Sequence, residues 1–277
     1  METAARAGYG YLRELVLAQS QNVLDPSRDY LFETRLTKLL RNQGMSSLEE
    51  LEQSLRTTSN PALEQAIAEA MTINETSFFR DGRPFELLRQ KLFPQLIEAR
   101  RRDRSLRIWS AGCATGQEAY SVAMLLLEHF PMLIGWNIRI EGTDISSEVI
   151  ERAQAGRFHR IEINRGLPAR YVARYFDHAS EDWIVKPEAR RLCNFRQASL
   201  CGPSFPFRRA SDYFDVILLR NVMLYFSPET RSALLAGMHR LLPPDGILLL
   251  GASEQPADLS LWTPVLAGGA CYYRPRK

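Results

Sequence analysis

Two acidic residues stand where a nucleoside ligand would need them. Glu118 lies in the first turn of a helical pattern, after the small residues of the segment IWSAGCATGQEAYS (108–121). Asp144 ends a second apolar stretch, in Gly142-Thr143-Asp144. A carboxylate at the end of a parallel strand can accept hydrogen bonds from ribose hydroxyls. The pair therefore predicts a nucleoside pocket, unless Glu118 only caps its helix and Asp144 only begins a turn.

The loop before Glu118 bears on which nucleoside would bind. Its glycines, Gly112 and Gly116, are spaced G-x-x-x-G, which is neither the G-x-G-x-x-G dinucleotide motif nor a P-loop. Small residues let the backbone approach a ligand, but this spacing does not indicate a phosphate cradle. The two acids would repel the phosphates of NAD or ATP, whereas S-adenosylmethionine carries cationic sulfonium and ammonium groups and a ribose. The spacing thus favours S-adenosylmethionine.

A third cluster of reactive side chains lies in the segment NETSFFRD (74–81). It places polar, aromatic and basic groups within a few positions, whereas an ordinary interdomain linker favours flexible polar residues or proline. We expect Phe78 and Phe79 to anchor the segment in the core. A plainer interpretation pairs Arg80 with Asp81 at the surface, but it leaves the other polar side chains of the segment unexplained.

The residues before this segment predict helices only, because apolar side chains recur at spacings of three and four. The pattern comprises Leu12, Leu15, Val16, Leu31, Leu36, Leu39, Leu40, Leu48, Leu51, Leu55, Leu63, Ile67, Ala70 and Met71. Residues 46–49 resemble a capping box, Asn60-Pro61 a helix start, and Gly44 the end of a helix. We expect a helical domain over 1–73 and a linker over 74–90.

The remainder alternates short apolar strands with helices, which is typical of a mostly parallel α/β sheet. We expect strands at 106–111, 137–143, 192–198, 213–219 and 246–251, and helices near 116–130, 146–155 and 227–242. Residues 261–265 and 271–274 flank Ala267-Gly268-Gly269-Ala270 and predict an antiparallel hairpin that closes the sheet. Residues 157–191 interrupt the alternation, which indicates an inserted β-subdomain at about 160–191.

Composition sets broad limits. The 277 residues are 45% hydrophobic and 24% charged with a net charge of +3, which is ordinary for a globular protein and does not favour nucleic acid as a partner. The four cysteines and four histidines show no metal-ligand spacing, so we expect no metal site and a reducing compartment. We find no signal peptide and no membrane-spanning run, and we expect a cytoplasmic protein.

Five motifs, in order and after a helical region, closely resemble the chemotaxis receptor glutamate methyltransferase (CheR) family. They are NETSFFRD, WSAGCATGQEAYS, GTDIS, FDVILLRNVMLYF and GILLLGASE, and the resemblance covers nearly the whole chain. It implies a Rossmann-like methyltransferase domain with a seven-stranded sheet over 91–277. It also implies transfer of a methyl group from S-adenosylmethionine to receptor glutamates, giving methyl esters and S-adenosylhomocysteine.

The resemblance also implies roles for individual residues. The cofactor-binding residues would be Asn74, Thr76, Arg80, Gly112, Glu118, Asp144, Ser199, Leu200, Arg220 and Asn221, and the catalytic residues Arg80 and Tyr225. Ser199 stands where the family usually has asparagine, so a contact near the adenine would be lost or routed through water. No metal is implied.

The implied partner is the acidic methylation helices of a chemoreceptor's cytoplasmic domain. Arg28, Arg35, Lys38 and Arg41 share one side of a predicted helix and suit docking on such helices, although most stripes of this kind are only solvated faces. The segment DHASEDWIVKPEARRL (177–192) shows no peptide-gripping insertion, and nothing calls for more than a monomer. Two alternatives stay open, namely a methyltransferase with another substrate and a module that binds S-adenosylmethionine or receptors without turnover.

Overall fold

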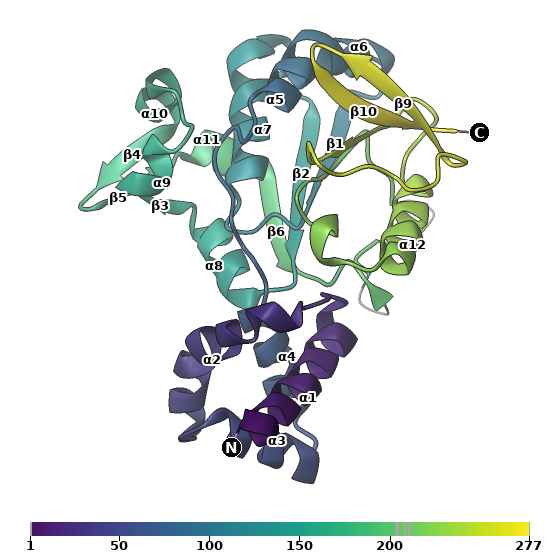
Figure 1. Ribbon diagram of the computed structural model, residues 1–277. Coiled ribbons are helices and arrows are strands. Elements are labelled where there is room, and N and C mark those ends of the chain that lie inside the picture. Colours follow the sequence, from purple (N-terminus) through teal and green to yellow (C-terminus); the bar gives the residue numbers. More distant parts are fainter. Residues whose placement is uncertain (1, 203–204, 208, 210–211, 277) are drawn as a thin grey trace. The chain divides into compact units, whose positions relative to one another are not determined.

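The computed structural model describes residues 2–202, 205–207, 209 and 212–276 (Figure 1). The chain divides into two compact units. One comprises Met1–Ile73 and Tyr225–Thr230, and the other comprises Asn74–Leu224 and Arg231–Lys277. No helix among the described residues is both long and apolar enough to cross a lipid bilayer.

The first unit is built from four helices, as the apolar spacing predicts. They are α1 (Glu2–Ser20), α2 (Tyr30–Gln43), α3 (Leu48–Thr57) and α4 (Pro61–Ala70), with a short 3₁₀ turn η1 (Pro26–Arg28) before α2. Their apolar stripes pack into one core around Val16, Phe32, Leu36, Leu51 and Ile67, each of them fully buried. Burial of these stripes stabilises helices that would be marginal alone.

Capping residues mark several helix boundaries where the sequence predicts them. Gly44 takes a left-handed φ of 68° after α2, and Asn60 Oδ1 accepts the N–H of Leu63 at 3.1 Å before α4. The predicted capping box is wrong by one residue. Ser47 is the N-cap of α3, and its Oγ accepts the N–H of Glu50, because the N-cap side chain bonds the N–H three positions ahead.

The second unit contains a seven-stranded sheet in the order β6-β2-β1-β7-β8-β10-β9. The strands are β1 (Ser105–Ala111), β2 (Asn137–Asp144), β6 (Cys193–Gln197), β7 (Val216–Leu219), β8 (Ile247–Leu250), β9 (Trp262–Ala267) and β10 (Ala270–Pro275). The first five pair in parallel, and β10 runs antiparallel to β8 and β9. Every strand predicted from the sequence is therefore confirmed. The all-apolar β7 and β8 are fully buried, as expected for central parallel strands.

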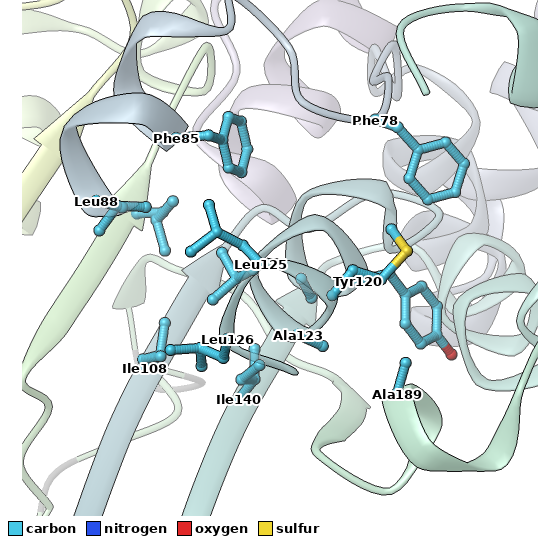
Figure 2. Close-up of a cluster of buried hydrophobic side chains, with 14 of the residues drawn as sticks. Phe78, Phe85, Leu88, Ile108, Tyr120, Ala123, Leu125, Leu126, Ile140 and Ala189 are labelled. Atoms are coloured by element: carbon cyan, nitrogen blue, oxygen red, sulfur yellow. The ribbon is translucent and has the colours of Figure 1, made fainter. Parts of the chain in front are cut away.

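Helices flank this sheet (Figure 1). The main ones are α7 (Gln117–His129), α8 (Ser147–Ala155) and α12 (Pro228–His239), all three near the predicted positions. A further stretch precedes β1, consisting of α5 (Arg83–Leu87), a π-helical turn η2 (Leu88–Leu92) and α6 (Phe93–Ala99). Figure 2 shows Phe78 and Phe85 among the buried side chains of α7, such as Tyr120 and Leu125. The segment after residue 74 is thus part of the core of this unit.

The inserted subdomain is a three-stranded antiparallel sheet in the order β3-β5-β4. Its strands are β3 (Arg157–His159), β4 (Phe176–Ala179) and β5 (Asp182–Val185), accompanied by α9 (Arg160–Asn164), α10 (Ala169–Tyr175) and α11 (Pro187–Arg190). In Figure 1 it lies at the left of the main sheet. The first strand begins at Arg157, a few residues before the predicted start, because β3 follows the Gly156 cap of α8 directly.

Candidate functional site

The strand order creates a crevice between β1 and β7. From β1 the sheet extends through β2 to β6 on one side and through β7 to β8 on the other. In open α/β sheets ligands bind outside the carboxyl ends of the strands at this reversal point. The residues that follow β1 are Gly112–Gly116, and those that follow β7 are Arg220 and Asn221. Both segments belong to motifs selected from the sequence.

Arg220 joins two carboxylates at this crevice, with only 1% of its side chain exposed. Nη1 donates to Glu118 Oε2 at 3.0 Å, and Nη2 donates to Asp81 Oδ2 at 2.7 Å and to the carbonyl of Arg80 at 2.8 Å. The hydroxyl of Ser110 donates to Glu118 Oε1 at 2.7 Å. One guanidinium between two carboxylates leaves one net negative charge beside the first turn of α7, which favours a cationic ligand.

Asp81 does not pair with Arg80 at the surface, as the plainer interpretation of the sequence has it. Asp81 binds Arg220 instead, and Arg80 Nη1 donates to the carbonyl of Glu75 at 2.7 Å. The interpretation as an Arg80–Asp81 surface pair is therefore wrong. The physical reason is that the buried guanidinium of Arg220 requires charged partners, whereas the half-buried Arg80 can be satisfied by a carbonyl.

The rest of the NETSFFRD segment is attached firmly to α7. Phe78 is fully buried and meets the ring of Phe158 edge-on at 4.9 Å between centroids. The N–H of Phe79 donates to Ser121 Oγ at 2.9 Å, and that hydroxyl donates to the carbonyl of Gln117 at 2.7 Å. The prediction that the two phenylalanines anchor the segment is confirmed.

Asn74 and Thr76 line a polar cavity of about 400 Å³. Thr115 and Gln117, at the start of α7, form another part of its wall. At the rim, Glu75 forms an ion pair with Arg165, which follows α9. Asn74 and Thr76 therefore face open space beside the small-residue loop, whereas Arg80 does not line this cavity.

Asp144 holds the loop that follows β1. Its Oδ2 accepts the N–H of Ala114 at 3.0 Å, and its Oδ1 accepts the N–H of Ser146 at 3.1 Å. Ala114 has a φ of 46°, a left-handed conformation that is uncommon without glycine. Asp144 thus begins a turn, as the plainer interpretation has it, and it also fixes the loop on which a ligand would rest.

The small residues of this loop also satisfy the protein's own packing. Gly112 has a φ of 73°, and a Cβ at this position would lie 2.5 Å from Cγ2 of Val222. The loop after β1 therefore approaches the loop after β7 more closely than any larger residue permits. Cys113 in the same loop is 2% exposed, and burial raises the pKa of its thiol well above the ordinary value. A neutral, enclosed thiol does not serve as a nucleophile.

Ser199 and Leu200 follow β6 and lie near the same edge. The Ser199 hydroxyl accepts the N–H of Cys201 at 3.2 Å and contacts its carbonyl at the same distance. Leu200 is buried, and the N–H of Ala198 donates to the carbonyl of Asp144 at 2.8 Å. The serine is therefore engaged in a local turn.

Tyr225 belongs to the helical unit. Its carbonyl accepts the N–H of Val23 at 2.8 Å, and the neighbouring Phe226 forms an isolated antiparallel bridge with Asn22. The structure thus groups Tyr225 with the N-terminal residues, whereas the other predicted site residues belong to the second unit.

Comparisons with known proteins bear on this geometry. A family profile described as "CheR methyltransferase, SAM binding domain" matches residues 74–267. The chain belongs to the CheR methyltransferase family. Chemotaxis protein methyltransferase 1 of Pseudomonas aeruginosa is 38% identical over 256 residues, 91% of each protein. Chemotaxis protein methyltransferase Cher2 of Pseudomonas putida is 36% identical over 84% of each, and a Vibrio parahaemolyticus chemotaxis protein methyltransferase is 38% identical over 86% of this chain and 85% of its own.

The cofactor of this CheR-family chain is S-adenosylmethionine, and the residues at the crevice fit it. Among the described side chains, Nε of Arg220 and Oδ1 of Asn221 at the crevice, and Nε of Arg274 on β10, are buried without a hydrogen-bond partner. Buried polar atoms are nearly always satisfied, so the two neighbouring atoms after β7 fit a polar ligand at the crevice. The net negative charge around Arg220 suits the cationic end of that ligand.

Three residues that contribute to this arrangement were missed by the sequence analysis. Asp81 and Ser110 bind the Arg220–Glu118 pair directly, and Glu254 binds the backbone of Asn221. Each lies within a motif that had been quoted. Only Asp81 carried a usable signal, because it is an acid directly after Arg80, which was assigned a role in the site.

Proposed function

We propose that this methyltransferase transfers the methyl group of S-adenosylmethionine to glutamate side chains on the cytoplasmic helices of chemoreceptors. The products are glutamate methyl esters and S-adenosylhomocysteine, and the reaction takes place in the cytoplasm. The observation that carries the proposal is the pairing of Arg220 with Glu118 and Asp81 at the switch point of the sheet, in a chain of the CheR family.

Methyl transfer to a glutamate requires that the two reactants be positioned, and it requires no proton transfer. S-adenosylmethionine supplies a methyl carbon bonded to a sulfonium. A glutamate oxygen attacks this carbon in line, a C–O bond forms, the C–S bond breaks, and its electron pair stays on sulfur. Glutamate has an ordinary pKa of about 4.3 and is ionised at neutral pH, so no general base is required. The protein's task is to align oxygen and carbon and to exclude water.

We assign the predicted site residues to this task. Glu118 faces the cationic methionine end, Asp144 the ribose, and Ser199 and Leu200 the adenine side. Gly112 lets the methionine part lie against β1, and Asn74 and Thr76 close the site from the cavity that they line. Arg220 and Asn221 line the opposite wall, where their unpartnered atoms lie. We assign residues 91–277 to the methyltransferase domain, and residues 74–90 to a segment that carries the NETSFFRD motif and folds with the same unit.

Arg80 is expected to orient the substrate carboxylate by a charge-assisted hydrogen bond. Replacement with alanine should lower the turnover number on a receptor fragment by about 10- to 100-fold, because such bonds contribute about 1.5–3 kcal/mol. Calorimetric titration with S-adenosylhomocysteine measures the cofactor side of the same variant. Arg83→Ala, an exposed arginine three positions along, is the matched control. Unchanged turnover together with unchanged cofactor binding would contradict the role of Arg80.

The Tyr225 hydroxyl is proposed to hold the incoming carboxylate or to line the methyl channel. Tyr225→Phe removes only this hydroxyl, so the variant separates the two roles. A hydroxyl that holds the carboxylate lowers turnover when it is lost, whereas a channel-lining ring leaves turnover nearly intact.

The overall reaction is tested with labelled cofactor and a receptor cytoplasmic fragment. Glutamate methyl esters release volatile methanol on mild alkaline treatment, whereas most other methylated products do not. We expect the receptor fragment to become labelled, and we expect alkali to release this label as volatile methanol. Stable label would indicate a methyltransferase with another substrate, and cofactor binding without transfer would indicate a binding module.

Helix α2 is proposed as the docking element for the acidic receptor helices. Arg41 is exposed in its last turn, and Arg28 is exposed in the preceding η1 rather than in α2. Arg35 is a weaker candidate than its spacing suggests, because its Nη1 donates to the carbonyls of Met71 and Thr72, both at 2.9 Å. Lys38 is exposed one turn before Arg41 and remains in the proposed patch.

Charge reversal tests this docking patch without disturbing Arg35. The double change Arg28→Glu and Arg41→Glu should raise the KM for a receptor fragment about tenfold at low salt, with little effect at high salt, because exposed charges are screened. The control is Arg102→Glu, an exposed arginine of the other unit. An equal KM for the double variant and the wild type at low salt would rule out docking through this patch.

A further inference from the structure

A buried carboxylate after β8 holds the loop that follows β7. Glu254 is 8% exposed and accepts three backbone N–H groups. Its Oε2 accepts from Asn221 at 2.6 Å and from Gly251 at 2.8 Å, and its Oε1 accepts from Met223 at 2.7 Å. Both oxygens are therefore used to fix main-chain positions in two separate loops.

The loop that Glu254 holds has an unusual backbone. Asn221 takes a φ of 61°, in the left-handed region that residues other than glycine rarely adopt. It directly follows Arg220, whose side chain is almost fully enclosed. Such a conformation persists only where surrounding contacts impose it, and the bonds from the N–H groups of Asn221 and Met223 to one carboxylate are contacts of this kind.

The end of β8 approaches this loop very closely. A Cβ on Gly251 would lie 2.5 Å from Oε2 of Glu254 and 2.9 Å from the backbone nitrogen of Asn221. Any side chain at residue 251 would therefore displace the carboxylate, the loop or both. The glycine and the glutamate together set the position of the residues that follow β7.

We infer that Glu254 is a positioning residue for cofactor binding. Its carboxylate fixes the backbone at Asn221 and Met223, and thereby directs the unpartnered Oδ1 of Asn221 and Nε of Arg220 toward the ligand. Glu254 itself acts through these neighbours. This inference rests on the proposed function in one respect, namely that Arg220 and Asn221 line the cofactor site.

Glu254→Gln tests the inference with almost no change in shape. A carboxamide has one oxygen and one N–H₂ group, so one of the two Glu254 acceptor positions would become a donor facing a backbone N–H. The loss of at least one charge-assisted bond and the new donor–donor contact should shift the loop. We expect the Kd for S-adenosylhomocysteine and the KM for S-adenosylmethionine to rise about tenfold or more, with a smaller change in kcat.

Asp245→Asn is the matched control at the other end of β8. Asp245 accepts from Arg100 at 2.7 Å and 2.8 Å, so its replacement also weakens a carboxylate contact that stabilises this unit. We expect a lowered Tm but a Kd for S-adenosylhomocysteine within about twofold of the wild type. Equal Kd increases in both variants, or none in Glu254→Gln, would show that Glu254 serves stability alone.

Gly251→Ala provides a second test if Glu254→Gln does not fold. It keeps the carboxylate but displaces it, so we again expect a raised Kd for S-adenosylhomocysteine. A Kd within twofold of the wild type would overturn the inference. Because these titrations contain no receptor, they are independent of the substrate. The proposed function fails separately if the wild type binds S-adenosylhomocysteine but esterifies no receptor glutamate.

Discussion

Replacing Arg220 with methionine is expected to weaken the binding of S-adenosylhomocysteine by about 100-fold or more and to destabilise the unit by about 3–5 kcal/mol. The first effect follows from the proposed place of Arg220 in the cofactor site, where its buried Nε has no hydrogen-bond partner among the described residues. The second follows because the side chain of Glu118 is only 12% exposed and, among the described residues, forms an ion pair with Arg220 alone. Titration calorimetry and thermal unfolding measure the two effects separately.

Arg220→Lys separates the charge of this residue from its geometry. An ammonium keeps the positive charge but cannot bridge Glu118, Asp81 and the carbonyl of Arg80 in one plane. We expect stability to recover in part and cofactor binding to remain weak. Arg157→Met, which breaks the exposed pair with Asp182, is the control and should change neither quantity appreciably. Wild-type affinity in Arg220→Met would remove Arg220 from the cofactor site.

Replacing Arg100 with methionine is expected to destabilise the unit by about 3–5 kcal/mol, lowering its Tm by roughly 10 °C, while cofactor affinity stays unchanged. Arg100 Nε donates to Asp215 at 2.7 Å, and its other nitrogens donate to Asp245. Asp215 has a side chain only 1% exposed and precedes β7, at the opposite end from the crevice. Without the guanidinium, a buried carboxylate remains uncompensated.

The loss of unfolding free energy in Arg100→Met should become smaller as the pH falls. Burial raises the pKa of Asp215 in the native state, while the N–H of Arg107 and the charge of Arg100 oppose this rise. Removing Arg100 raises that pKa further, and a carboxyl with a raised native pKa costs stability above that pKa and none once protonated. In the wild type Arg100 lowers the pKa of Asp245, a stabilisation that is itself lost in acid.

The Asp215 contribution therefore brings the variant and the wild type closer together between neutral pH and about pH 4, and the Asp245 contribution does so below about pH 4. Unfolding at a series of pH values measures this convergence. Arg101→Met, beside it in the chain, is the control, because its pair with Glu98 is exposed and 3.8 Å long. A deficit of Arg100→Met that is constant with pH would mean that Asp215 is not the group left uncompensated.

Local patterns in the sequence were sufficient for most of the fold. The four N-terminal helices were predictable from apolar residues spaced by three and four, and the central strands from short continuous apolar runs, because each pattern reflects burial whatever the partner. The positions of Glu118 and Asp144 followed from the same logic, since the end of a strand is visible in the chain. The start of the subdomain at Arg157 was less predictable, because so short a strand has no period of its own.

The contacts within the site depended on tertiary structure. The pairing of Asp81 with Arg220 joins residues 139 positions apart, and the bond from Asn221 to Glu254 spans 33 positions. Which charges meet depends on the strand order that brings loops together, and no local period encodes that order. The sequence alone thus determined the elements, the family resemblance and the acids near the ligand. Only the fold decided how a buried arginine is neutralised and which carboxylate holds its loop, because both result from burial of groups brought from separate strands.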